Sequence, residues 1–169
     1  MLVGLLADTH DRLPAISALL GRMAERGVAV VLHAGDFSAP FSLAPFIEAQ
    51  IAIAGVFGRN DGDREGLRAK AAQAFALELF ESPHSFEFGG KRILVVHDLG
   101  DVNDRSIEAH QLVVSGCTHR QEQARRGETL LVNPGEGCGW LHGVPSAAIV
   151  DLATMQVEMI ALGGDEWEK

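Results

Sequence analysis

In the first half of the chain, short runs of apolar residues alternate with segments that carry a helical pattern. The runs are rich in Val, Ile, Leu and Ala and have the length of buried strands. The predicted strands are 2–7, 28–32 and 51–57. The predicted helices are 14–26, 40–50 and 63–75. This order of strands and helices predicts a parallel sheet that is covered on both faces.

The second half of the chain favours strands, with one short helix over 105–110. Gly89-Gly90 joins two apolar segments in the manner of a hairpin turn. The predicted strands of this half are 85–88, 91–96, 111–115, 129–132, 147–152 and 156–162. No linker or repeat divides the 169 residues, so we expect one α/β domain over 1–162, followed by an acidic tail over 163–169.

The charge balance excludes one broad class of function. The chain has 14 Lys and Arg against 23 Asp and Glu, a net charge of −9. This excess argues against general nucleic-acid binding, because the phosphate backbone would be repelled over most of the surface. A phosphorylated small molecule or nucleotide remains compatible where a metal ion or local cations supply positive charge.

The absence of targeting signals leads to an expectation about the compartment. No apolar run reaches the length of a membrane span, and the first apolar run has no basic lead and stops at Asp8. Two cysteines are too few for a disulfide framework. We therefore expect a cytoplasmic protein with no membrane partner.

Polar motifs fall just after five of the predicted strands. They are Asp8-Thr9-His10, Gly35-Asp36, Gly58-Arg59-Asn60-Asp61, His97-Asp98 and Gly116-Cys117-Thr118-His119. In open α/β sheets, ligands bind outside the carboxyl ends of the strands, so these motifs are expected at one rim. Apart from Arg, the residue types are ligands for Mn, Zn, Fe or Ni.

Each motif also has a simpler interpretation when it is taken alone. A D-x-H is common, and Gly-Asp after a strand is usually a turn or a helix cap. A lone His97 is more often hydrogen-bonded structure than a ligand, and Cys117 alone is most often a small buried hydrophobe. The four histidines outside the motifs are interpreted as structural or surface residues: His33, His84, His110 and His142. The order of the motifs at successive strand ends favours a site.

Together with Asn133-Pro134-Gly135, these motifs resemble those of the calcineurin-like metallophosphoesterases. The resemblance covers nearly the whole chain and points to the small bacterial and archaeal phosphodiesterase branch. It implies a four-layer α-β-β-α sandwich with mixed sheets and a two-metal site at its rim. The first ion would be held by Asp8, His10, Asp36 and His119.

The second metal position departs from the family pattern. Asp36 would bridge the ions and His97 would be a ligand, but Arg59 stands where the family has Asn and Cys117 where it has His. Arginine has no lone pair for a metal, so an inward Arg59 would repel the second cation while binding phosphate. Alternatively, Arg59 points outward and Asn60 supplies an amide oxygen. A Cys117 thiolate could also serve as a zinc ligand.

These departures favour one divalent ion over two. The resemblance then implies a hydrolase, a metal-dependent phosphoesterase that uses a metal-bound hydroxide on a phosphodiester or phosphomonoester. Arg59 and Asn60 would contact the phosphoryl group, and Asp61 would orient a neighbour. A homo-oligomer is left open.

The alternative is a catalytically weakened scaffold of the same fold, which binds another protein. Its candidate surface is the apolar segment 40–47, with Phe37 alongside it. A helix that packs its Phe face on the sheet is the favoured interpretation of this segment.

Overall fold

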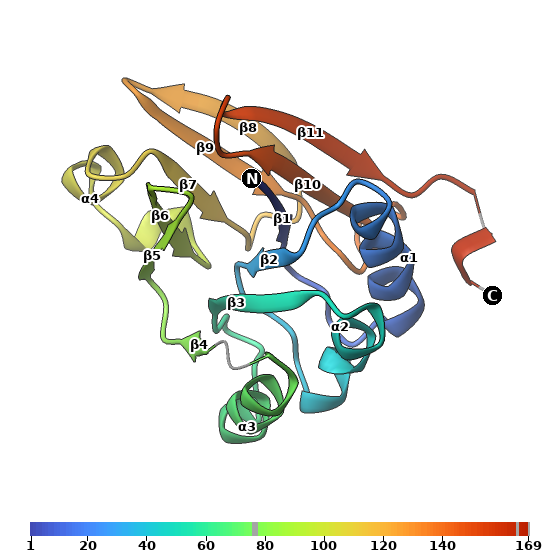
Figure 1. Ribbon diagram of the computed structural model, residues 1–169. Helices are drawn as coiled ribbons and strands as arrows, with labels where there is room; N and C mark the ends of the chain where they lie inside the picture. The colour runs from blue at the N-terminus through green and yellow to red at the C-terminus, as the bar shows by residue number, and fades with distance from the viewer. Residues whose placement is uncertain (76–77, 165, 169) are drawn as a thin grey trace.

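The computed structural model describes residues 1–75, 78–164 and 166–168 (Figure 1). Its first sheet has six strands in the order β11-β10-β1-β2-β3-β4. The bounds are β1 (Leu2–Leu6), β2 (Val30–His33), β3 (Ala52–Val56), β4 (Leu79–Phe80), β10 (Ser146–Asp151) and β11 (Gln156–Ala161). Strands β1 to β4 run parallel, whereas β10 and β11 form an antiparallel hairpin beside β1.

The second sheet has five strands in the order β5-β6-β7-β9-β8. The bounds are β5 (His84–Phe88), β6 (Lys91–Val96), β7 (Leu112–Ser115), β8 (Gln121–Arg126) and β9 (Thr129–Pro134). Strands β6, β7 and β9 are parallel, and the two edge strands are antiparallel to their neighbours. Both sheets are therefore mixed, as the family resemblance implied.

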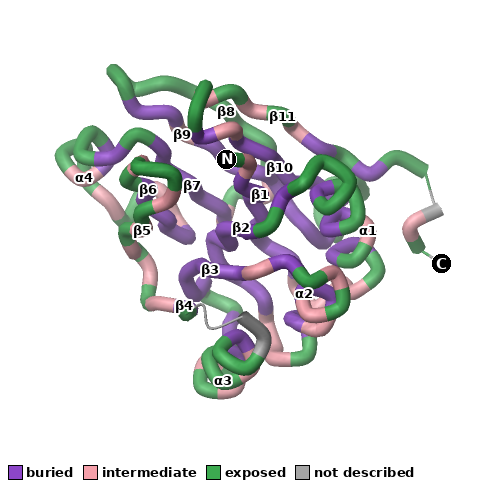
Figure 2. Tube along the Cα trace, viewed as in Figure 1, coloured by how far each residue is buried: buried purple, intermediate pink, exposed green. Residues whose placement is uncertain are grey.

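Four layers follow from how the apolar side chains are divided. Helices α1 (Leu13–Ala24), α2 (Ala44–Ala49) and α3 (Arg64–Phe75) pack on the outer face of the first sheet. A second apolar cluster fills the space between the two sheets, and a small third cluster lies under α4 (Asp104–Glu108). Figure 2 shows the buried strands at the centre of the molecule. The predicted α-β-β-α sandwich is confirmed.

The order of strands and helices led us to expect a parallel sheet covered on both faces, and the first sheet differs from this in detail. Helices cover only one face, because the other face packs on the second sheet. The segment 40–50 is a 3-10 turn (Pro40–Leu43) followed by α2. Its apolar face is buried through Phe37, Leu43 and Phe46, whereas Phe41 is exposed. This segment packs on the sheet, which is the interpretation that the sequence favoured.

Strand β8 and a turn in the tail were not predicted from sequence, and neither were the two-residue strand β4 and the 3-10 turn Leu99–Asp101. Every residue of β8 is exposed and all but Ala124 are polar, so the strand has no alternating apolar face to reveal it. In the tail, Glu166–Glu168 forms a 3-10 turn in which Trp167 packs against the main core and Glu168 pairs with Arg12. Among the described residues, no helix is both long and apolar enough to cross a bilayer.

Candidate metal centre

The predicted motifs meet in loops that leave the carboxyl ends of strands from both sheets. Backbone hydrogen bonds tie these loops together: Asp8 N–H donates to Gly35 O at 3.0 Å, and Gly116 N–H donates to His97 O at 3.0 Å. The loops after β1 and β2 are thus paired directly, and so are those after β6 and β7. Strand ends far apart in the chain thereby present their side chains at one rim.

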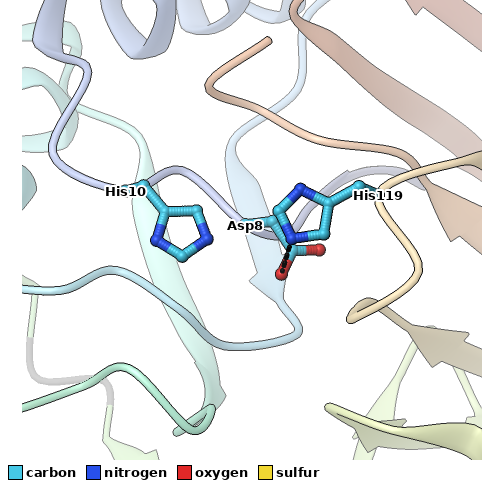
Figure 3. Close-up of side chains that lie close together, drawn as sticks. All are labelled: Asp8, His10 and His119. Atoms are coloured by element: carbon cyan, nitrogen blue, oxygen red, sulfur yellow. Dashed lines mark ion pairs between the residues drawn. The ribbon is translucent and has the colours of Figure 1, made fainter. Parts of the chain in front are cut away.

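The first group of candidate ligands consists of Asp8, His10 and His119. Each offers one ligand atom, and these atoms lie within 4.8 Å of one another. Nε2 of His119 lies 3.6 Å from Oδ1 of Asp8, the contact drawn as a dashed line in Figure 3. The rings of His10 and His119 are stacked with centroids 5.5 Å apart. Oδ1 of Asp8 is buried and accepts no hydrogen bond from the described residues.

The second group consists of Asp8, Asp36 and His97, all buried and again with ligand atoms within 4.8 Å. Oδ2 of Asp36 lies 3.6 Å from Nε2 of His97 and 3.6 Å from Nε2 of His10. The ring of His97 is oriented by its other nitrogen, since Nδ1 donates to Ala34 O at 2.8 Å. The carboxylate of Asp36 therefore lies between the two groups.

These two groups have the chemistry of a divalent-metal site. Two ligand atoms that each lie about 2.1 Å from one ion are separated by about 3.0–3.4 Å, close to the 3.6 Å observed here. A buried carboxylate oxygen without a donor is costly unless a cation or another partner satisfies it. Imidazole and carboxylate together suit Zn, Mn, Fe and Ni. The residues present therefore fit such an ion.

Arg59 and Cys117, the two departures from the family pattern, lie together at the outer edge of the site. Nη2 of Arg59 donates to Asp98 at 2.6 Å, and its Nη1 lies 3.6 Å from the Sγ of Cys117. The side chain of Arg59 is 62% exposed. The side chain of Arg59 thus points outward, as in one of the two alternatives, but the Asn60 amide turns its NH₂ group and not its oxygen toward Asp36. The close ligand groups of the described residues do not include Cys117.

Asn60 and Asp61 both contact Asp36 or its loop. Asn60 donates to Oδ1 of Asp36 from its backbone N–H at 2.8 Å and to Oδ2 from its side-chain amide at 2.7 Å. The buried carboxylate of Asp61 accepts from the backbone N–H groups of Asp36, Gly58 and Ser38. Asp61 therefore anchors the loop that carries Asp36.

The backbone of the site is strained at the ligand residues themselves. Asp8, His10, Asp36 and His119 all have left-handed φ values, between +38° and +63°. Such conformations cost about 1 kcal/mol or more each, and they cluster at functional sites. Gly35 is required as well, because its φ is +96° and an added Cβ would lie 2.5 Å from Gly58 N.

Burial shifts the pKa values of Asp8 and His10, the two titratable residues of the first motif. Desolvation raises the pKa of Asp8 to about 6, against a lowering influence of His119 and His97. Burial lowers the pKa of His10, and the nearby Asp36 opposes this shift. A neutral His10 has a lone pair available for a metal, whereas Asp8 must lose its proton at a pH near 6 before it can bind one.

The histidine interpreted as structural, His33, does hold the loops in place. It is fully buried, and burial lowers its pKa well below the usual value. Its Nδ1 accepts from Gly35 N–H at 3.1 Å, and its Nε2 lies 3.1 Å from Thr9 Oγ1. His33 therefore connects the loops after β1 and β2.

Two residues near the site have roles that the sequence did not reveal. Asn133 donates to Gly116 O and to Thr118 Oγ1, so the Asn-Pro-Gly turn supports the loop that carries His119. Glu136 accepts from Nδ1 of His119 at 3.0 Å. Burial alone would raise the pKa of Glu136, but hydrogen bonds from the loop and from His119 lower it. A single acidic residue after a turn has no periodic signal, although its place beside Asn133-Pro134-Gly135 could have marked it.

Comparison with known proteins points to one family. Residues 1–155 match the family model described as the calcineurin-like phosphoesterase superfamily domain. The phosphodiesterase MJ0936 of Methanocaldococcus jannaschii is 28% identical over 165 residues, covering 96% of this chain and 99% of the relative. The solved structure of an archaeal phosphodiesterase, also 28% identical, superimposes with a TM-score of 0.89 over 96% of this chain and all of the other. A Vps29 variant from Entamoeba histolytica has a TM-score of 0.68 at 16% identity, over 96% of this chain and all of the other, and shares the fold.

Proposed function

Because this chain belongs to the calcineurin-like phosphoesterase superfamily, we propose that it is a metal-dependent hydrolase that cleaves a phosphodiester. The similarity to a phosphodiesterase along almost the full length of both chains supports the diester over the monoester. Asp8, His10, Asp36 and His119 would hold the main ion. The observation that carries the proposal is the buried Oδ1 of Asp8, which accepts from no donor in the part of the chain that the structure describes and faces Nε2 of His119 at 3.6 Å.

The second metal position is proposed to be the weaker one. Asp36 and His97 offer ligand atoms there, and the amide of Asn60 lies against the same carboxylate. Arg59 has no lone pair to offer a metal at this position, and the Cys117 thiol lies against Arg59 and Asp98 at its outer edge. One tightly held ion per chain is therefore favoured over two.

The residues divide the chemistry between them. A divalent ion, when bound, supplies a nucleophile near neutral pH and offsets the negative charge of the phosphoryl group. Asn60 can donate its side-chain amide to a phosphoryl oxygen, and the exposed guanidinium of Arg59, once it releases Asp98, can take a bidentate hold on the same group. Asp61 keeps Asp36 in place through three backbone hydrogen bonds.

Hydrolysis of bis(4-nitrophenyl) phosphate with added Mn²⁺ tests the proposal. Asp36→Asn should lower the rate at least about 100-fold, because it removes the charged ligand between the two groups. The exposed Asp101→Asn should leave the rate unchanged. Faster cleavage of 4-nitrophenyl phosphate than of the diester would reassign the substrate to monoesters. Equal rates for the native protein and Asp36→Asn would contradict the enzyme altogether.

The surface that the sequence suggested for a protein-binding scaffold, segment 40–47, is largely buried. Phe37, Leu43 and Phe46 are buried against the sheet, so segment 40–47 presents mainly Phe41 to a partner. The scaffold would be favoured by tight metal binding without hydrolysis of either ester in Mn²⁺, Zn²⁺, Fe²⁺ or Ni²⁺.

A further inference from the structure

We propose that Glu136 is a positioning residue that fixes the metal ligand His119 and, through the same carboxylate, the loop 139–143 beside it. This inference rests on the proposed function. Glu136 follows β9 by two residues, and its side chain is only 1% exposed. A buried carboxylate at this place needs several donors, and the structure shows where they come from.

The first contact of Glu136 sets the orientation of the His119 ring. Oε2 of Glu136 lies 3.0 Å from Nδ1 of His119. A carboxylate can only accept, so Nδ1 carries the proton and Nε2 keeps its lone pair. Nε2 is the atom that faces Oδ1 of Asp8. Carboxylates that hold a metal-binding histidine in this way commonly change metal affinity by about 10- to 100-fold when they are removed.

The other contacts of Glu136 hold a loop that has little burial of its own. Leu141 N–H donates to both carboxylate oxygens, at 3.1 and 3.0 Å, and His142 N–H donates to Oε1 at 2.6 Å. The side chains of Trp140 and Leu141 point outward and are 60% and 68% exposed. The loop is therefore held by backbone hydrogen bonds and by Arg12 stacked over the Trp140 ring, and Glu136 accepts from two of its N–H groups.

His142 of this loop lines a groove that also contains the metal ligand His119. The groove has a volume of about 520 Å³ and is lined by His119, Arg120, His142 and Val144, among others. A phosphodiester carries a second organic substituent that must lie somewhere beside the reacting phosphorus. The groove offers that substituent a surface next to His119, so a displaced loop should weaken substrate binding as well as metal binding.

Replacement of Glu136 by glutamine separates the positioning role from packing. Glutamine has nearly the same shape, but only one end of its amide accepts hydrogen bonds. The glutamine oxygen can accept from the His119 ring or from the loop. Its NH₂ group then lies against the N–H group that has lost its acceptor. A carboxylate accepts from the His119 ring and from the loop together, since each of its oxygens is an acceptor.

Calorimetric titration with Mn²⁺ alone provides the test. We expect Glu136→Gln to bind Mn²⁺ about 10- to 100-fold more weakly than the native protein. The exposed Glu128→Gln should bind it normally. In diester hydrolysis, Glu136→Gln should raise KM as well as lower kcat. Mn²⁺ binding within twofold of the native value by a folded Glu136→Gln protein would overturn the inference. The titration needs no turnover, so this outcome is distinct from failure of the proposed activity.

A second measurement covers the case in which the variant does not fold. In ¹⁵N NMR of the native metal-free protein, we expect His119 to be the Nδ1–H tautomer. The Nε2–H tautomer would overturn the inference, because Glu136 would then not be accepting from the ring.

Discussion

Oδ1 of Asp8 has no hydrogen-bond donor among the described residues and lies 3.6 Å from Nε2 of His119, which is on a loop late in the chain. Folding thus brings a buried carboxylate to an imidazole without satisfying both of its oxygens. In the metal-free protein burial destabilises the charged form of Asp8 and raises its pKa to about 6, although the nearby His119 opposes this shift. The cost of that burial is offset when a cation binds.

The first prediction concerns the stability of the metal-free protein. The pKa of Asp8 is higher in the folded state than its ordinary value of 3.8, so folding loses stability as the pH rises from about 4 to above 6. Asp8→Asn removes that loss and should raise the free energy of unfolding by about 1–3 kcal/mol at pH 8. Urea unfolding of the native protein and of Asp8→Asn, in EDTA at pH 4 and pH 8, measures this difference in the free energy of unfolding. A variant that is less stable than the native protein at pH 8 would contradict the explanation.

Metal binding should weaken in acid. Protons compete with the metal for Asp8 below pH 6, so Mn²⁺ affinity is expected to fall at least about tenfold between pH 7 and pH 5. Calorimetry across this range measures the fall. At neutral pH, saturating Mn²⁺ should add about 2.7 kcal/mol of stability at 100 times its Kd, and EDTA should reverse the gain. Affinity independent of pH would exclude Asp8 as a ligand.

Asp61 is predicted to matter for stability as well as for the site. Its carboxylate accepts from three backbone N–H groups in the loops that hold Asp36. Asp61→Asn replaces one acceptor oxygen by a donor and should cost about 2–4 kcal/mol in free energy of unfolding. Urea unfolding measures the loss, with the exposed Asp101→Asn as the matched change. A loss below about 0.5 kcal/mol would show that these hydrogen bonds are replaceable.

Restoring the family residues should complete the second metal position. Arg59→Asn combined with Cys117→His removes the cation at the outer edge of the site and adds two ligands. Bound metal is expected to rise from about one to about two ions per chain, with faster diester hydrolysis. Elemental analysis of the purified double variant counts the ions. An unchanged count would mean that these two positions do not limit the second site.

Much of this site could be predicted because its ligands follow recognisable strands. Asp8 and His97 come directly after apolar runs and Asp36 three residues after β2, and parallel strands bring such residues to one rim. The buried runs themselves were found by composition and length. Strand β8 was missed because all of its residues are exposed, so pairing with β9 and not burial determines it.

The details that the sequence did not predict depend on long-range contacts. The direction of Arg59 is set by Asp98, which follows a strand of the other sheet. The left-handed backbone at Asp8 lies where the loop after β1 is hydrogen-bonded to the loop after β2, a contact between residues far apart in the chain. Glu136 acquires its role only when the loop 139–143 folds over it.

Anomalous diffraction from crystals grown with Mn²⁺, measured above and below the manganese edge, tests the central claim most directly. We expect a peak about 2.0–2.3 Å from Oδ1 of Asp8 and from ligand atoms of His10, Asp36 and His119. The result that would contradict the account is saturating Mn²⁺ with no peak among these side chains and Oδ1 of Asp8 still without a partner.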